Sequence, residues 1–401
     1  MNVIKIHRAE EVGELPAQAD LFGLADGAAR FALEVPPEVG SVLDAAAPVF
    51  IGVSGGRDSQ ALAYRICAHL DDVGHSGQRF LIHAHLGRVE WRDSLPVCER
   101  LAQRLGVELV VVRRQAGDMM DRWLSRWAGN VARYADLECV KLIMPWSSAS
   151  QRFCTSELKS QVLAREMRRR FPHGDVVSAV GIRREESARR AQMPAWKRDE
   201  RLTRKRGIGH TWNAILGWRR QDVNDYVRSR GDLLHEAYRI YGSTRVSCAF
   251  CVMGSEHDLR ASSNCADNHE IYREMVELEV ASTFSFQSNR WLGDVAPDLL
   301  DASLRARLLE AKERARTRVE AESRLPEHLL FVKGWPTVTP TAEEAELIAC
   351  VRRDVAVSVG LQVNHTDRDS VLARYQELIA AAVAKASATG LPLEDNEGIE
   401  A

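Results

Sequence analysis

The sequence predicts an α/β protein whose core is a parallel sheet, followed by a helical C-terminal region. In the first half of the chain, apolar stretches rich in β-branched residues alternate with amphipathic stretches, as in strands joined by crossover helices. The expected strands cover residues 48–53, 80–86, 107–113 and 176–180, and the helices 59–70 and 94–105. From about Asp258 onward the periodicity is helical, over residues 268–280, 301–322, 342–357 and 367–388. Such a sheet binds ligands beyond the carboxyl ends of its strands.

Length and composition indicate a soluble globular protein. The chain has 401 residues, of which 45% are hydrophobic and 27% charged, and its formal net charge is -2. The stretch from Gln151 to Arg230 holds 20 Lys/Arg and nine Asp/Glu, so it carries about +11. This stretch is either a solvated basic face or a surface for phosphate or nucleic acid.

We expect four regions along the chain. An N-terminal lead-in covers residues 1–45, an α/β domain with a cysteine site covers 46–257, a helical region covers 258–388, and an acidic tail covers 389–401. The first residues lack the apolar core of a signal peptide, and no apolar run approaches about 18 residues. We therefore expect a cytoplasmic protein without a membrane partner.

A phosphate-binding loop is predicted directly after the first strand. The string Ser54-Gly55-Gly56-Arg57-Asp58-Ser59 joins the strand to a helix, so its backbone N–H groups and the helix dipole can point at one anion. The hydroxyls of Ser54 and Ser59 add donors. A pair of glycines alone would suit an ordinary β–α turn, but the full string is more specific, and it is not a Walker A motif because no G-K-[ST] closes it.

A second anion site is predicted after the fourth strand. The segment from Gly181 to Arg190 reads G-I-R-R-E-E-S-A-R-R, and arginine offers a fork of donors that matches phosphate. The alternative is a basic helix start, with Glu185 and Glu186 in its first turn.

Four of the eight cysteines are candidate metal ligands. Cys248 and Cys251 form a C-x-x-C pair, Cys265 is close in sequence, and Cys154 can reach them through the fold. Four thiolates suit a 4Fe-4S cluster or a zinc ion, with His257 or His269 as substitutes in the zinc case. Buried structural thiols are the alternative.

Taken in order, these motifs resemble the phosphoadenosine phosphosulfate (PAPS) reductase family of the PP-loop ATP pyrophosphatase superfamily. The resemblance covers about residues 48 to 255 and implies the adenine nucleotide alpha hydrolase-like (HUP) fold. The matching segments are Ser54 to Ser59, His85 to Glu90, Cys154 with Lys159, Gly181 to Arg190, Trp218 to Val223, and Tyr241-Gly242 leading into Cys248-x-x-Cys251.

One departure points to a branch of the family. Reductases that turn over PAPS or APS use a cysteine in a C-terminal E-C-G-x-H segment, whereas residues 391–401 contain no cysteine. The four-cysteine arrangement instead resembles the DNA phosphorothioation protein DndC and its relatives, which combine a PP-loop with an iron-sulfur cluster. That resemblance implies that ATP adenylates an oxygen of the acceptor, that pyrophosphate leaves, and that sulfur then displaces AMP.

The resemblance also assigns roles to residues. The implied catalytic residues are Asp58, Arg183, Arg184 and Arg190. The implied nucleotide-binding residues are Ser54, Gly55, Gly56, Asp58, Ser59, Glu90, Lys159, Gly181 and Ser187. Mg2+ is expected with ATP, and Cys154, Cys248, Cys251 and Cys265 are the implied ligands of a 4Fe-4S cluster, with zinc as the alternative.

The leading hypothesis is an ATP-dependent sulfur-transfer enzyme acting on nucleic acid, with DNA favoured over RNA. Its expected partners are a cysteine desulfurase as sulfur donor and other subunits of a modification complex. Two alternatives stay open: a PAPS or APS reductase that uses an external thiol, and a non-catalytic nucleotide-binding subunit of a modification or defence complex.

Overall fold

The computed structural model describes residues 30–389, which form two compact units. The first, here called the α/β unit, contains residues up to Met120 and Ser147–Tyr272. The second, the helical unit, contains Asp121–Trp146 and the residues from Arg273 onward. The division differs from the expected ranges, because residues 121–146 group with the C-terminal helices and residues 258–272 group with the sheet. The first 29 residues of the expected lead-in and nearly all of the expected acidic tail lie outside the described residues.

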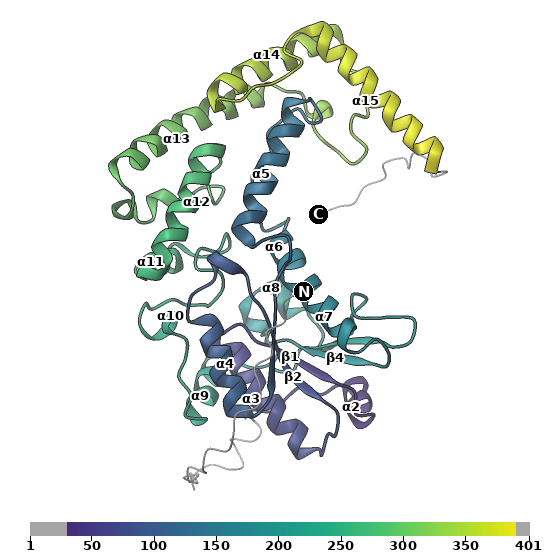
Figure 1. Ribbon diagram of the computed structural model, residues 1–401, viewed down its shortest axis with the longest axis vertical. Helices are drawn as coiled ribbons and strands as arrows, with labels where there is room; N and C mark the ends of the chain where they lie inside the picture. The colour runs from purple at the N-terminus through teal and green to yellow at the C-terminus, as the bar shows by residue number, and fades with distance from the viewer. Residues whose placement is uncertain (1–29, 390–401) are drawn as a thin grey trace. The chain divides into compact units, whose positions relative to one another are not determined.

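The α/β unit is built on a mixed sheet of six strands, in the order β3-β2-β1-β4-β6-β5. Figure 1 labels β1, β2 and β4 of this sheet. Five strands are parallel to their neighbours, and β5 runs antiparallel to β6 at one edge. The strands are β1 (Val49–Gly52), β2 (Arg79–Ala84), β3 (Glu108–Val112), β4 (Val176–Ala179), β5 (Trp196–Arg198) and β6 (Gly209–Trp212). The predicted α/β class is therefore confirmed, and all four predicted strands are present.

Helices cover both faces of this sheet, as the continuous burial of Val49, Phe50 and Ile51 in β1 requires. Val49 and Ile51 belong to a core shared with α3 (Arg57–Asp72), α4 (Ser94–Leu105) and α9 (Arg220–Ser229), whereas Phe50 belongs to a second core with α7 (Gln161–Arg170). Shorter helical segments of the unit are α2 (Pro37–Asp44), η1 (Gly87–Val89), α6 (Phe153–Thr155), η2 (Ser156–Ser160), η3 (Arg184–Glu186), α8 (Ala188–Ala191), α10 (Glu236–Arg239), α11 (Glu256–Ser263) and η4 (Ala266–Asn268).

The described part of the lead-in packs on the α/β unit. The indole N–H of Trp212 donates to the carbonyl of Glu34 at 2.7 Å, and that of Trp218 donates to the carbonyl of Ala32 at 2.9 Å. Phe31 lies against Trp218, with ring centroids 5.4 Å apart. These contacts hold the segment before α2 in place.

The helical unit consists mainly of long helices. They are α5 (Met119–Ala135), α12 (His269–Ser282), α13 (Ala302–Ser323), α14 (Ala342–Val359) and α15 (Arg368–Thr389), with the short segments η5 (Leu292–Asp294), η6 (Pro297–Leu299) and η7 (Glu327–Leu329). Met119 and Met120 of α5 and residues 269–272 of α12 group with the α/β unit. Within residues 30–389, no helix is long and apolar enough to span a membrane.

A buried arginine joins three segments of the helical unit. The guanidinium of Arg352 donates to the carbonyls of Tyr134 and Ala135 at the end of α5, and to those of Asn364 and His365 before α15. Arg352 is fully buried and lies over the Tyr134 ring, 4.9 Å from its centroid. These bonds connect α14 to the end of α5 and to the segment before α15.

Candidate functional site

The predicted phosphate loop lies between β1 and α3 and is closed by its own serine. The Ser54 N–H donates to the Ser59 hydroxyl at 3.1 Å, and this hydroxyl donates to the Gly56 carbonyl at 2.7 Å. Gly55 has a φ of +75°, a conformation that favours glycine. The predicted loop residues therefore come together, at the carboxyl end of β1 and the N-terminus of a 16-residue helix.

The loop rests on two residues that the sequence analysis did not select. A Cβ atom on Gly55 would lie 2.9 Å from the Ser94 carbonyl oxygen and 3.2 Å from His235 Cδ2. His235 Nδ1 accepts from the Ala237 N–H at 3.0 Å, so the other ring nitrogen, Nε2, carries the proton and donates to Ser94 Oγ at 3.2 Å. Burial lowers the pKa of His235 to about 4, which keeps the ring neutral near pH 7.

Asp58 and Arg183 form an ion pair beside the loop. Arg183 Nε donates to an Asp58 carboxylate oxygen at 2.5 Å, and the same guanidinium pairs with Glu185. The Arg183 side chain is only 5% exposed. Burial raises the pKa of Asp58, and the charge of Arg183 opposes that rise. The predicted second anion site thus meets the loop directly through this pair.

The other two predicted catalytic arginines are paired closer to the surface. Arg184 donates twice to the Glu34 carboxylate, at 2.5 and 2.8 Å, and Arg190 pairs with Glu186. Their side chains are 43% and 34% exposed. Exposed ion pairs contribute only about 0 to 1 kcal/mol each, so a phosphate could replace either carboxylate at little cost.

Gly181 and Ser187 stabilise the backbone of the segment after β4. A Cβ on Gly181 would lie 3.0 Å from the Asp58 carbonyl oxygen, so glycine favours this close approach between the segment after β4 and α3. The Ser187 hydroxyl accepts from the Arg190 N–H at 3.2 Å and caps α8.

Glu90 lies under the loop in a buried pair with His83. Its carboxylate is 3.0 Å from His83 Nε2, and its second oxygen accepts from the Leu86 N–H at 3.0 Å. His83 Nδ1 donates to the carbonyl of Val53, the residue before the loop, at 3.0 Å. Burial opposes ionisation of both side chains. The pKa of Glu90 is nevertheless lowered by His83, and that of His83 is raised well above its usual value by Cys98 and Glu90.

The segment that carries the C-x-x-C pair packs on the phosphate loop. Glu90 and Cys248 form an antiparallel bridge, and the Ala249 N–H donates to the Val89 carbonyl at 2.8 Å. Arg57, the first residue of α3, donates to the Thr244 carbonyl and stacks on the Tyr238 ring, 4.3 Å from its centroid. These contacts place the cysteine segment beside the loop.

Two of the other predicted thiol ligands act electrostatically on Cys248. Its pKa is raised to about 12, mainly by burial; Lys159 opposes the rise, and Cys251 and Cys154 add to it. Cys154 and Lys159 lie on one continuous helical stretch, and Lys159 lies in its π-helical turn, Ser156–Ser160. Single π-turns of this kind are frequent at functional sites.

Cys265 has a different neighbour. It is buried and hydrogen-bonds Tyr241, which raises the pKa of that phenol to about 12. The two histidines considered as substitutes face carbonyls, His257 that of Gly242 and His269 that of Ser263, both at 2.9 Å. Among the residues that the structure describes, no three Cys, His, Asp or Glu side chains are already arranged around a metal position. Cys251 and Cys154 both act on Cys248, and thiols are donors that an iron-sulfur cluster or zinc accepts.

Sequence reasoning missed Arg57, Ser94, His235 and Tyr238. Arg57 stands inside the loop string, so its position was the available signal. Ser94, His235 and Tyr238 are distant from the loop in the sequence and belong to no recognisable motif. Only the fold brings them next to the loop.

Comparison with known proteins identifies the family of the α/β unit. Residues 48–252, half of the chain, match the phosphoadenosine phosphosulfate reductase domain. An uncharacterized 37.8 kDa protein of Escherichia phage 186 is 25% identical over 163 residues, which cover 40% of this chain and 42% of that protein. The match thus spans less than half the length of this relative.

A solved structure of PAPS reductase from Candida auris, in complex with phosphate, is also similar. It has a TM-score of 0.32 and 10% sequence identity, over 50% of this chain and 80% of that chain. On the match over residues 48–252, the chain belongs to the phosphoadenosine phosphosulfate reductase family.

Proposed function

We propose that this protein is a nucleotide-utilising enzyme that uses ATP to activate an oxygen of a nucleic-acid acceptor for sulfur transfer. The observation that carries the proposal is the packing of the cysteine segment on the phosphate loop, through the Glu90–Cys248 bridge and the contact of Arg57 with Thr244. A nucleotide on the loop and sulfur ligands beside it would then share one site. An enzyme that only hydrolysed a nucleotide would not need thiols there.

The loop would hold the pyrophosphate part of ATP. Its N–H groups and the dipole of α3 favour anions, and Mg2+ would accompany the phosphates. The acceptor oxygen attacks the α-phosphorus, the bond to the bridging oxygen breaks, and pyrophosphate leaves. A sulfur nucleophile then attacks the activated atom, and the C–O or P–O bond to AMP breaks.

We assign different roles to the three arginines because their side chains differ in exposure. Arg184 and Arg190 can exchange a surface carboxylate for phosphate, because their present pairs are weak. Arg183 would keep Asp58 in place, since breaking a buried pair costs about 3 to 5 kcal/mol. We therefore assign phosphate contact to Arg184 and Arg190, and positioning of the loop to Arg183 with Asp58.

Cys154, Cys248 and Cys251 would hold a 4Fe-4S cluster, or zinc as the alternative, with Cys265 as the fourth ligand. When bound, an iron-sulfur cluster supplies iron that can carry a transferable sulfur. The charge of about +11 over residues 151–230 supports a nucleic-acid acceptor, and a cysteine desulfurase is the proposed sulfur donor.

A second candidate is a PAPS or APS reductase that uses an external thiol. The family match favours it. The raised pKa of Cys248 disfavours this cysteine as a nucleophile, because the thiolate is the reactive form. An outside thiol such as thioredoxin would have to take the sulfonate.

The test is product analysis with the full chain. ATP is supplied with duplex DNA or with tRNA, and pyrophosphate and AMP are measured. Release that depends on nucleic acid is the expected result, and Arg190→Gln should lower it at least about 10-fold. Arg316→Gln is the matched control, because it removes an exposed arginine of α13 that pairs with Glu313 and lies outside residues 151–230.

Two outcomes would contradict this proposal. If sulfite forms from PAPS or APS with a thiol donor while no pyrophosphate forms from ATP, the reductase is the correct assignment. ATP binding without any product would instead indicate a nucleotide-binding subunit.

A further inference from the structure

A group of cations lies at the edge of the sheet where β4 and β6 begin. These two strands are parallel, and their first residues are Val176 and Gly209. The turn from α7 into β4 and the turn between β5 and β6, residues 199–208, therefore lie at this edge. The phosphate loop follows the end of β1, which is parallel to β4, so the loop lies at the opposite edge.

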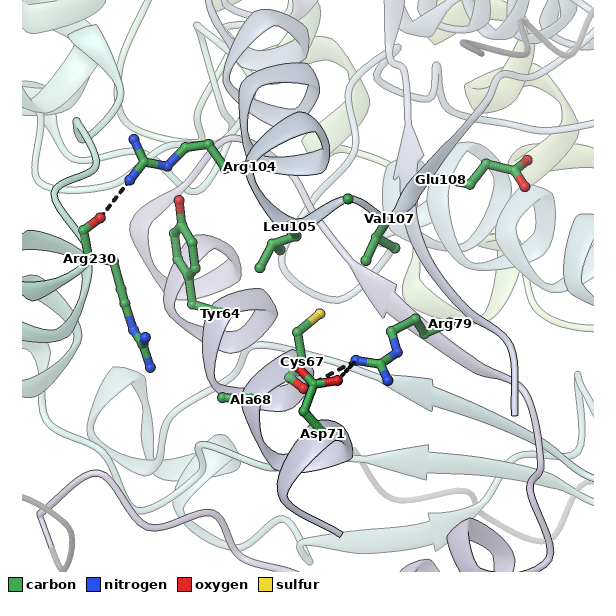
Figure 2. Close-up of a pocket in the computed structure, with 11 residues that line it drawn as sticks. Tyr64, Cys67, Ala68, Asp71, Arg79, Arg104, Leu105, Val107, Glu108 and Arg230 are labelled. Carbon is green, nitrogen blue, oxygen red and sulfur yellow. Dashed lines mark hydrogen bonds and ion pairs between the residues drawn. The ribbon is translucent and has the colours of Figure 1, made fainter. Parts of the chain in front are cut away.

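Beside β2 and β3 the charged residues of this edge are paired. Arg79, the first residue of β2, pairs with Asp71 at 2.7 Å, as Figure 2 shows. Glu108, the first residue of β3, pairs with Arg170 of α7 at 2.8 Å. This part of the edge is therefore close to neutral.

The carboxylates beside β4 and β6 also have partners of their own. The pairs are Glu166 with Arg169 and Arg170, Asp199 with Arg201, Glu200 with Arg198, and Asp175 with the ring of His210. These acidic groups therefore leave the other cations of this part of the edge without a counter-charge.

Five such cations form no ion pair among the residues that the structure describes. Two of them lie on the exposed side of α7, and three lie in the turn between β5 and β6. They are Arg165, Arg168, Arg204, Lys205 and Arg206, here called the basic edge.

The turn that carries three of these cations is fixed to its neighbour. The backbones of Arg204 and Gly207 form an antiparallel bridge, and the Gly174 N–H donates to the Arg206 carbonyl at 2.8 Å. The Arg204 guanidinium donates to the carbonyls of Pro172 and Gly174, at 3.2 and 2.7 Å. These bonds hold three consecutive cations against the turn from α7 into β4.

Arg168 brings a further positive charge to this turn. Its guanidinium donates to the Arg201 carbonyl at 2.9 Å. Burial lowers the pKa of Arg204 and the charge of Arg168 lowers it further, whereas Asp175 opposes this change. Like charges held close together repel, so an anion bound between them would be favourable.

α7 connects the basic edge to the cysteine segment. Lys159, whose charge acts on Cys248, precedes Arg168 by nine positions on one continuous helical stretch. At about 1.5 Å per residue this separation is about 14 Å, which equals about four base pairs of duplex at about 3.4 Å each. A duplex bound to the basic edge could therefore extend to Lys159.

We propose that the basic edge binds the phosphate backbone of a nucleic-acid duplex and anchors it beside the cysteine segment. The proposal rests on the proposed function only in taking this duplex to be the acceptor. Contacts from Lys and Arg to phosphates give affinity without sequence preference. A membrane surface fits less well, because residues 203–207 carry no aromatic or large apolar side chain that could insert.

The test is an anisotropy titration of a labelled DNA duplex of about 30 base pairs with the full chain, without ATP. The variant is Lys205→Gln/Arg206→Gln, whose two exposed side chains make no hydrogen bond or ion pair within residues 30–389, so folding should be unaffected. Its affinity should fall at least about 10-fold at about 0.1 M salt. The slope of log K against log[salt] should become less steep by about 2, because two phosphate contacts are lost.

Arg307→Gln/Arg316→Gln is the matched control, because it removes the same two charges from exposed positions of α13. It should keep the affinity and the slope of the parent. No binding of the duplex by the parent at about 0.05 M salt, or an equal change of slope in both variants, would overturn the proposal. Weaker binding of Lys205→Gln/Arg206→Gln to phosphatidylserine vesicles, with unchanged binding to the duplex, would overturn it in favour of a membrane.

Failure of this surface and failure of the proposed reaction give different results. Duplex binding that weakens in the variant as expected, without any pyrophosphate from ATP, would refute the reaction and support the surface. Pyrophosphate release by a protein whose duplex binding the variant leaves unchanged would refute the surface and support the reaction.

Discussion

The neutral histidine under the phosphate loop makes stability depend on pH in a way that can be measured. Burial lowers the pKa of His235 to about 4, against about 6.5 in an unfolded chain. Between these values the unfolded state binds a proton that the folded state does not, so stability falls as pH falls. A difference of about 2.5 units corresponds to about 3 kcal/mol, lost progressively between pH 6.5 and 4.

The perturbation is His235→Asn, which removes the titrating group while the side-chain oxygen can still accept from the Ala237 N–H. Urea denaturation of both proteins is followed from pH 7.5 to 4.5. The difference in the free energy of unfolding between the two proteins should decrease as the pH falls. Only the parent protein contains an imidazole that must stay neutral in the folded state, so only the parent loses stability on this account. His173→Asn, at an exposed position before β4, is the control and should follow the parent curve. Parallel curves for His235→Asn and the parent would refute the reasoning.

Three further predictions concern single side chains. Gly55→Ala should lower the free energy of unfolding by at least about 1 kcal/mol and abolish nucleotide binding in calorimetry. The reason is that φ is +75° and the new Cβ would lie 2.9 Å from the Ser94 backbone. Unchanged binding would show that the loop tolerates a side chain. Arg352→Met should cost about 2 kcal/mol by thermal denaturation, because four hydrogen bonds of the guanidinium, one buried and three partly buried, are lost, and a shift in melting temperature of less than one degree would contradict this. Anaerobically purified Cys248→Ala should lose the bound iron and the visible absorbance that are expected of the parent. Cys67→Ala, which removes a buried thiol of the α3 core, should keep both. If the parent contains no iron, the cluster proposal is contradicted.

Much of the sheet could be predicted because its strands are locally distinctive. Residues 48–53 and 176–180 are apolar and β-branched, and the structure has β1 and β4 there. The pair β5 and β6 was missed. The β6 sequence Gly-His-Thr-Trp has no apolar run, and it is buried because Trp212 and Thr211 pack beside β4 and not because of local pattern.

Helix prediction worked in the same way for the C-terminal region. The expected stretches 301–322 and 342–357 correspond to α13 and α14 within two residues. The grouping of α5 with these helices was not predictable from order along the chain. It depends on contacts between residues more than 200 positions apart, such as those of Arg352 with the end of α5.

For the phosphate loop, the sequence alone determined its place, its glycine and its serines, because a β-strand, a tight turn and a helix N-terminus are local features. Only the tertiary structure decided what surrounds the loop. Arg183 is held by Asp58 from 125 residues away, and the neutral ring of His235 supports Gly55 from far along the chain. Charge neutralisation and close packing depend on distances in space. A single sequence does not show which residues far apart along the chain are close in space.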